Sequence, residues 1–294
     1  MRSRLERNKK NRNQITKVVV EEKTKNITIK VFKISLALFI ILSIIFVVFR
    51  YVATSGLVVR EYGIDYDIPD NFYGLKIIQI SDLNYNSETV DLDKAKQLVS
   101  KTNKLKPDLV LYTGDLIYKD IDNKDNDNLS KELSKINSTL GKYYVSGEED
   151  NDEAKIILTN AGFENLDNNY ELIYKDNNSP ILLTGIGNDN DYDKAFEYIK
   201  NGDKEIFTIT MIHNPKDIEE IINQYQIDLL LAGHTFNGLI KIPKIGGVFN
   251  FECKYYDDYY KVDNTDVYIS NGIGTKEYPY RLFNHPSINF FRLR

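Results

Sequence analysis

Residues 230–238 read LLAGHTFNG, and this stretch decides the class of fold. The largely apolar run from Ile227 to Ala232 predicts a buried strand, and His234 follows it after a single glycine. In open α/β sheets, ligands gather at the carboxyl ends of the strands. The position of His234 therefore predicts a ligand-binding residue at the rim of such a sheet.

Three further predicted strands end in the same way. Residues 77–80 lead to Asp82, residues 109–113 lead to Asp115, and residues 207–212 lead to His213. Aspartate and histidine are common ligands of divalent metals. The chain has only three histidines, and two of them follow strands of this kind. This convergence predicts a metal site; the alternative is that Asp115 caps a helix and the histidines are polar rim residues without a ligand.

The rest of the chain alternates between predicted strands and helices. Helical spacing of apolar residues, as in residues 91–105, follows several of the strands, whereas the tail is mostly strand-like. The tail strands are predicted at 238–242, 248–252, 266–270 and 288–293. Alternating βα units that end in antiparallel strands favour a mixed-sheet α/β or α+β sandwich.

An apolar segment near the N-terminus predicts a membrane anchor at residues 34–53. Residues 34–49 carry no charge, and residues 51–53 extend the stretch to about 20 residues, which matches the ~30 Å core of a bilayer. Two alternatives are a buried core helix and a cleaved signal peptide, for which residues 52–56 offer small side chains. We favour an uncleaved anchor, because a long basic region precedes it and the segment has no polar face.

Charge is distributed unevenly along the chain. Residues 1–33 hold eleven basic and three acidic residues, a net charge of +8, so the remaining residues carry −13 of the total −5. The positive-inside rule places this arm in the cytoplasm and the domain at residues 74–294 outside, joined by a stalk at residues 54–73. The arm could also contact anionic lipids. An acidic body argues against nucleic acid as a partner, and the lone Cys253 excludes an intrachain disulfide.

Taken in order, the motifs resemble those of the calcineurin-like metallophosphoesterase superfamily, and most closely its membrane-anchored bacterial branch. The matching blocks are residues 75–84, 107–116, 147–150, 211–215, 233–236 and 269–275. The resemblance implies two central sheets that form a sandwich flanked by helices, with metals at the strand ends. It also implies hydrolysis of phosphoesters assisted by divalent metals.

The resemblance implies two sets of ligands that meet at Asp115. One set consists of Asp82, Asp115 and the positions of Asn84 and Phe236, where the family has histidines. The other set consists of Asp115, His213, His234 and Glu148, which stands where the family has asparagine. Phenylalanine cannot bind a metal, so the resemblance implies one divalent ion (Mn, Fe or Zn) rather than two.

A further substitution concerns turnover. Glu149 stands where the family has a catalytic histidine, and a glutamate could act as a general acid only with a raised pKa. An ionised Glu149 would repel a phosphate, whereas Asn84 would orient an oxygen of the substrate. The sequence thus predicts a membrane-anchored phosphoesterase with one impaired metal site.

The alternative function is that of an inactive relative that binds a component of the cell envelope. The binding surface would be the same cleft or the tyrosines at positions 255, 256, 259 and 260, although such tyrosines are more often part of a packed or partly exposed β-region.

Overall fold

The computed structural model describes residues 2–86, 90–119, 122–176, 179–189, 191–200, 206–242, 246–247, 253–276 and 280–294. The chain separates into two units, Met1–Phe49 and Arg50–Arg294. The predicted strand at 248–252 lies outside the described residues.

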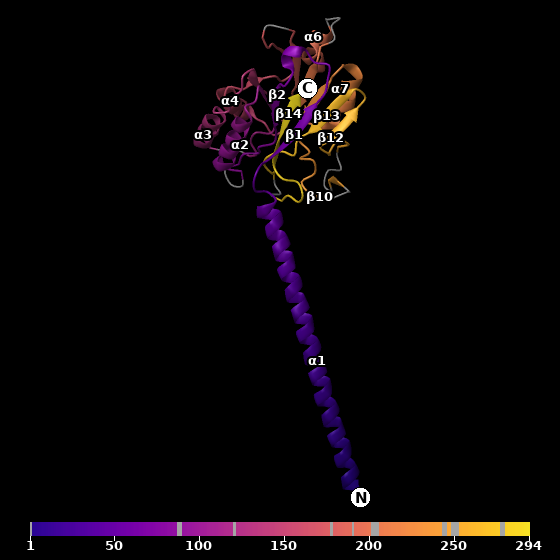
Figure 1. Cartoon of the computed structure of the whole chain (residues 1–294). Helices are drawn as coiled ribbons and strands as arrows, with labels where there is room; N and C mark the ends of the chain where they lie inside the picture. The colour runs from indigo at the N-terminus through magenta and orange to yellow at the C-terminus, as the bar shows by residue number, and fades with distance from the viewer. Residues whose placement is uncertain are drawn as a thin grey trace. The chain divides into compact units, whose positions relative to one another are not determined.

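The first unit is a single helix, α1 (Arg2–Val47), drawn in indigo in Figure 1. It is long and apolar enough to cross a membrane, and none of its most apolar window is buried in protein. Phe39, for example, is 68% exposed. A core helix would bury such side chains, so that alternative is wrong for this segment. A short π-helical turn, Val48–Val52, continues the chain.

The second unit contains two six-stranded sheets and a small hairpin. The first sheet has the order β1-β14-β2-β3-β4-β5, the second has the order β12-β13-β9-β8-β7-β6, and β10 pairs with β11. The strands are β1 (Val58–Ile64), β2 (Lys76–Ile80), β3 (Leu109–Thr113), β4 (Gly141–Val145), β5 (Glu164–Asn165), β6 (Asn169–Ile173), β7 (Ile181–Ile186), β8 (Thr208–Ile212), β9 (Leu229–Ala232), β10 (Lys241–Ile242), β11 (Gly246–Gly247), β12 (Tyr259–Val262), β13 (Thr265–Ile269) and β14 (Ser287–Leu293).

Both large sheets are mixed. In the first, β2, β3, β4 and β5 are parallel while β14 runs antiparallel to β2. In the second, β7, β8, β9 and β13 are parallel while β6 and β12 are antiparallel edges. The predicted mixed α/β fold with two sheets is confirmed.

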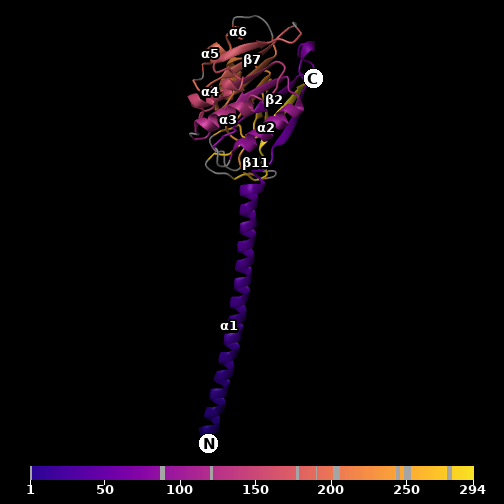
Figure 2. The ribbon, with the colours of Figure 1, turned by 90° about the vertical axis from the view of Figure 1, so that its left-hand side faces the viewer.

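Alternate residues of the central strands enter different cores, as the two-residue period of a strand requires. Ile77 and Leu109 face the space between the sheets, whereas the neighbouring Ile78 and Val110 face an outer layer of helices. That layer, seen from the side in Figure 1 and facing the viewer in Figure 2, consists of α2 (Leu92–Leu105), α3 (Asn123–Leu133) and α4 (Asp152–Asn160).

The second sheet is covered on its outer face by a smaller layer. This layer includes α5 (Tyr192–Ala195) and α7 (Ile218–Gln224), whose apolar residues share a core with β9 and β13. The remaining short helices are α6 (Glu197–Lys200) and the 3₁₀ turns Asp70–Phe72 and Pro215–Asp217. The two sheets are therefore enclosed between helices, which is the predicted sandwich.

Capping residues fix the starts of the longer helices. The Asp91 side chain accepts hydrogen bonds from the backbone N–H groups of Asp93 and Lys94, and the Asn151 side chain accepts one from Ala154. Helix α3 runs from Asn123 to Leu133, and the Asp122 side chain caps its first turn by accepting a hydrogen bond from the backbone N–H of Asp125.

Residues 58–64 were predicted to be part of a stalk, and this prediction is wrong. They form β1, which pairs in parallel with β14. Tyr62 stacks on Phe291 with ring centroids 5.3 Å apart and also lies 4.6 Å from Tyr268 of the opposite sheet. β1 is therefore part of the folded domain, and its mixed side-chain pattern is that of an edge strand.

The tyrosines considered as a binding patch are mostly packed. Tyr255 is buried and meets Tyr260 in an edge-to-face contact, and the Tyr260 hydroxyl accepts hydrogen bonds from the backbone N–H groups of Tyr256 and Asp257. Tyr259 is exposed but donates a hydrogen bond to Asp266. These contacts explain the cluster as local structure.

Replacing Phe291 tests the packing between the sheets. Phe291 is fully buried between Tyr62 and Tyr268, so Phe291→Ala is expected to lower the free energy of unfolding by about 3–5 kcal/mol. The exposed Tyr73 serves as a control, and Tyr73→Ala should change the free energy of unfolding by less than about 0.5 kcal/mol. Urea unfolding followed by near-ultraviolet circular dichroism measures both, and equal effects would contradict the assignment of this core.

Candidate metal centre

Four strands deliver the predicted ligands to one edge of the sandwich. Asp82 follows β2, Asp115 follows β3, His213 follows β8 and His234 follows β9. β2 and β3 are neighbours in one sheet, and β8 and β9 are neighbours in the other. The two sheets are joined below this edge by Gln79, whose buried side chain donates to the carbonyl oxygen of Ala232 at 2.9 Å.

The backbone turns sharply at these strand ends. Residues with a left-handed backbone there include Asp82 (φ 51°), Asn84 (φ 48°), Asp115 (φ 57°), His234 (φ 66°) and Phe236 (φ 52°). Residues other than glycine rarely adopt this conformation, which costs roughly 1–2 kcal/mol each. Such backbone strain is concentrated at functional sites, because the surrounding fold must hold it.

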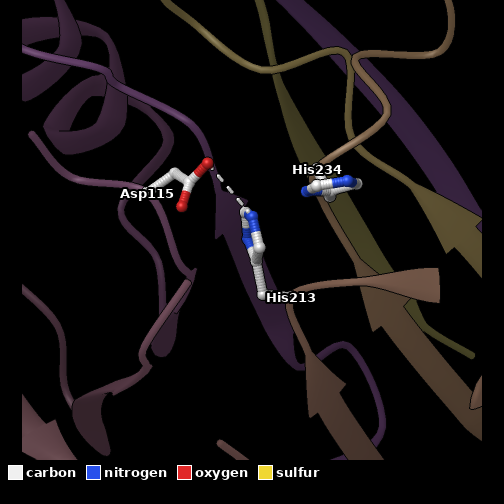
Figure 3. Close-up of side chains that lie close together, drawn as sticks. All are labelled: Asp115, His213 and His234. Atoms are coloured by element: carbon white, nitrogen blue, oxygen red, sulfur yellow. Dashed lines mark ion pairs between the residues drawn. The ribbon is translucent and has the colours of Figure 1, made fainter. Parts of the chain in front are cut away.

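Asp115, His213 and His234 come together. One ligand atom from each lies within 4.8 Å of the others. The side chains reach this place from three separate strand ends, and Asp115 and His213 point toward one another beside the His234 ring (Figure 3). Asp115 and His213 are buried, while His234 is partly exposed, so the group is open to solvent on one side.

The orientation of His213 suits a metal ligand. Its Nδ1 lies 2.7 Å from the carbonyl oxygen of Thr113, which makes Nδ1 the donor. Its Nε2 therefore faces Asp115, 3.2 Å from Oδ2. A hydrogen bond of this kind on one ring nitrogen fixes the other as the ligand atom.

Two glycines allow these groups to approach closely. A Cβ atom on Gly114, whose φ is +83°, would lie 2.5 Å from Nδ1 of His213. A Cβ atom on Gly147 would lie 2.2 Å from Oδ1 of Asp115. Any larger residue at either position would displace a candidate ligand.

Asp150 is a positioning residue that the sequence interpretation missed. Its carboxylate accepts hydrogen bonds from the backbone N–H groups of Asp115, Leu116 and Gly147 at 2.7–2.8 Å. It thus joins the loop after β3 to the loop after β4. Burial, together with the charge of Asp115, raises the pKa of Asp150 to about 6.

Glu148 lies at the open side of the group. Its Oε2 is 3.2 Å from Nδ1 of His234, and its Oε1 accepts a hydrogen bond from Asn214 at 2.6 Å. Burial acts to raise the pKa of Glu148, but the hydrogen bond from Asn214 and the two histidines lower it overall. Glu148 therefore presents a carboxylate to the same space as His234.

The other predicted half of the site is different in character. Asp82 is buried, and its Oδ2 accepts hydrogen bonds from the Ser81 hydroxyl and the backbone N–H of His234. Its Oδ1 and both side-chain atoms of the buried Asn84 have no hydrogen-bond partner within the described part of the chain. A Cβ atom on Gly272 would lie 2.7 Å from the Phe236 ring and 2.9 Å from Cβ of Asp82, so the ring is packed close to Asp82.

Lys276 is the second residue that the sequence interpretation missed. Its Nζ lies 2.8 Å from Oδ2 of Asp115 and 3.1 Å from Oε1 of Glu149. The backbone N–H of Glu149 also donates to Oδ1 of Asp115, at 3.1 Å. One sequence signal could have indicated a residue such as Lys276. The acidic side chains at 148–150, together with Asp82 and Asp115, require a positive charge nearby.

The electrostatics follow from burial and from these contacts. Burial raises the pKa of Asp82 to about 6, although the charge of His213 acts in the opposite direction. Burial acts to raise the pKa of Asp115, but His213 and Lys276 hold it well below its usual range. Burial and the charge of His213 lower the pKa of His234. At pH 7 Asp115 is thus a carboxylate and His234 is neutral, as metal binding requires.

The fold and this arrangement define a class of protein. A profile of the calcineurin-like phosphoesterases matches residues 75–237, which is more than half of the chain. The chain belongs to this family, whose members use divalent metals, and the predicted resemblance is confirmed.

The chain is similar in sequence to proteins from several organisms. The uncharacterized metallophosphoesterase YkuE of Bacillus subtilis is 28% identical, over 83% of this chain and 88% of its own length. A transmembrane protein with metallophosphoesterase domain from Danio rerio is 26% identical, over 75% of this chain and 53% of its own length. The phosphodiesterase YaeI of Escherichia coli is 25% identical, over 76% of this chain and 84% of its own length.

The protonation of His213 predicts how metal affinity depends on pH. Burial alone would lower the pKa of His213, but the negative charge of Asp115 and the hydrogen bond to its carboxylate raise this pKa to about 10. Without a cation, Nε2 therefore carries a proton at pH 7, and a metal must displace it. Affinity for Mn²⁺ should rise by up to about tenfold per pH unit from pH 6.5 to 8.5. Isothermal titration calorimetry tests this, and a dissociation constant independent of pH would contradict it.

Proposed function

We propose that this chain is a membrane-anchored, metal-dependent hydrolase of phosphoesters that holds one divalent ion. The observation that carries the proposal is the convergence of Asp115, His213 and His234, with ligand atoms within 4.8 Å of one another. The three residues follow the ends of β3, β8 and β9, and the chain belongs to a family whose members use divalent metals. Two imidazoles and a carboxylate, with Glu148 beside them, suit Mn²⁺, Fe²⁺ or Zn²⁺.

The residues of the Asp82 half do not fit a second ion. Asn84 offers a neutral amide, and Phe236 offers no ligand atom at all. A divalent ion held by Asp115, Glu148, His213 and His234 would supply positive charge that polarises a phosphoryl oxygen and makes water more acidic.

The chain's own groups would position the substrate. We assign Asn84 to orient a phosphoryl oxygen, because its buried amide has no partner among the described residues and can donate two hydrogen bonds. Thr113 keeps Nε2 of His213 directed at the ligand space through its carbonyl oxygen. Glu149 pairs with Lys276, so we assign it no proton transfer.

A cavity beside the metal residues offers room for the rest of a substrate. It has a volume of about 160 Å³ and is lined by Glu148, His213, Asn188, Asn214 and Lys216, among others. Amide and ammonium groups in the lining suit a polar or anionic leaving group. A relative with the same family domain is named a phosphodiesterase, which makes phosphodiesters the first substrates to try.

Metal content and turnover test this proposal together. The full-length chain, purified in detergent and loaded with Mn²⁺, should hold about one ion and hydrolyse a chromogenic phosphodiester. His234→Ala should lower the rate by at least about 100-fold and metal affinity by about 10- to 100-fold, as loss of a ligand does. His285→Ala replaces an exposed histidine and should change neither. If the chain binds no metal and does not hydrolyse the phosphodiester, the proposed enzymatic function is refuted.

We propose further that the phosphoesterase domain lies outside the cytoplasm. The proposal rests on the excess of eleven basic over three acidic residues in 1–33, next to the apolar helix. Protease added to intact cells should then remove an epitope fused after Arg294 but spare one fused before Met1. The reverse pattern, or protection of both, would contradict this orientation.

The second candidate function is a binding module without turnover. It is favoured by the substitutions at Asn84, Phe236 and Glu149, since each removes a group that the family uses for metal or phosphate. Such a module would use the same cleft for a component of the envelope. It predicts ligand binding with no hydrolysis, even when the metal is present.

A further inference from the structure

The impaired half of the site contains a fixed positive charge. Asp82 and Asp115 are both fully buried, and Glu149 lies at the rim, yet the ligands for a second ion are missing. Buried carboxylates need a compensating cation, because burial of an unpaired charge is costly. The ammonium group of Lys276, whose side chain is 23% exposed, supplies such a charge on the side of Asp115 away from His213.

The place of Lys276 is fixed by the backbone before it. The N–H groups of Ile273 and Gly274 both donate to the carbonyl oxygen of Asp82, at 3.1 and 2.8 Å. A Cβ atom on Gly274 would lie 3.0 Å from Cβ of Asn84. The segment is therefore tied to Asp82 and Asn84, and Lys276 enters the site from this side.

Asp115 is contacted as a bridging carboxylate would be. Its Oδ2 lies 2.8 Å from Nζ of Lys276 and 3.2 Å from Nε2 of His213. One oxygen thus has the lysine on one side and the candidate metal ligand on the other. Oδ1 is occupied separately by the backbone N–H of Glu149.

We propose that the ammonium group of Lys276 takes the place of a second metal ion and, with Asn84, binds an oxygen of the phosphoryl group. This inference rests on the proposed function for the metal half of the site. An ammonium group has three N–H donors. Contacts with Asp115 and Glu149 account for two of them, and the described residues offer no third partner, which leaves one donor for a substrate oxygen.

The charges also explain why Glu149 is tolerated. A lysine carries one positive charge where a divalent ion carries two, so it neutralises Asp115 and Glu149 only in part. Glu149 competes with the phosphoryl group for the same ammonium. The chain should accordingly bind phosphate through Lys276, with Glu149 weakening that binding.

Binding of inorganic phosphate to the Mn²⁺-loaded full-length chain tests the inference by calorimetry. Lys276→Met should weaken phosphate binding by roughly 10- to 100-fold, the value of a hydrogen bond to a charged group. Lys276→Arg, which keeps the charge, should restore most of it. Lys96→Met is the matched control, because it removes an exposed lysine of α2 with the same change in net charge, and it should leave binding unchanged.

Glu149→Gln separates substrate binding from a purely structural role. If Lys276 binds phosphate, this variant should bind it several-fold more tightly, since the competing carboxylate is gone. If Lys276 only completes an ion pair that holds the loop, Glu149→Gln should weaken binding as Lys276→Met does. That result would overturn the inference.

Metal analysis by mass spectrometry gives a readout independent of turnover. About one Mn²⁺ per chain is expected, and two per chain would overturn the inference, as would phosphate binding that Lys276→Met leaves unchanged. Phosphate binding that depends on Lys276, in a chain that hydrolyses nothing, would refute the proposed enzyme but support the lysine site. If the chain hydrolyses phosphoesters but Lys276→Met binds phosphate as tightly as the unchanged chain, the proposed enzyme is supported and the lysine site is refuted.

Discussion

The carboxylate of Asp115 is the group on which the rest of the site depends. It is fully buried, so its charge must be balanced. His213 and Lys276 contact one of its oxygens, and a backbone N–H donates to the other. Its own backbone is held by Asp150. The loops after β3, β4 and β8 and the segment that contains Lys276 are thereby arranged around one negative charge.

The sandwich makes this arrangement possible, because the two sheets bring strand ends from both halves of the chain to one edge. Gln79 links the sheets directly below that edge, and alternating apolar residues of the strands fill the cores on either side. The left-handed residues at the strand ends are unfavourable locally. Three well-filled cores supply the stability that keeps them in place.

Strand ends could be predicted from the sequence because apolar runs and the residues after them are local patterns. Asp115, His213 and His234 were found in this way, and the family resemblance added Glu148. Lys276 and Asp150 could not be predicted from such local patterns. The long side chain of Lys276 reaches partners that are distant in the sequence, and an acidic residue before a helix, such as Asp150, suggests a helix cap. β1 was missed because an edge strand exposes one side and lacks a continuous apolar run.

A charge carried on a side chain differs from a bound ion in one respect: it cannot leave. The occupancy of an ion site follows the concentration of the free ion by mass action, so a chelator empties it. The ammonium of Lys276, tied to Asp82 through Ile273 and Gly274, stays at a concentration fixed by the covalent chain. In the proposed site, removal of the metal therefore leaves the positive charge of Lys276 in place, whatever the ionic composition around it.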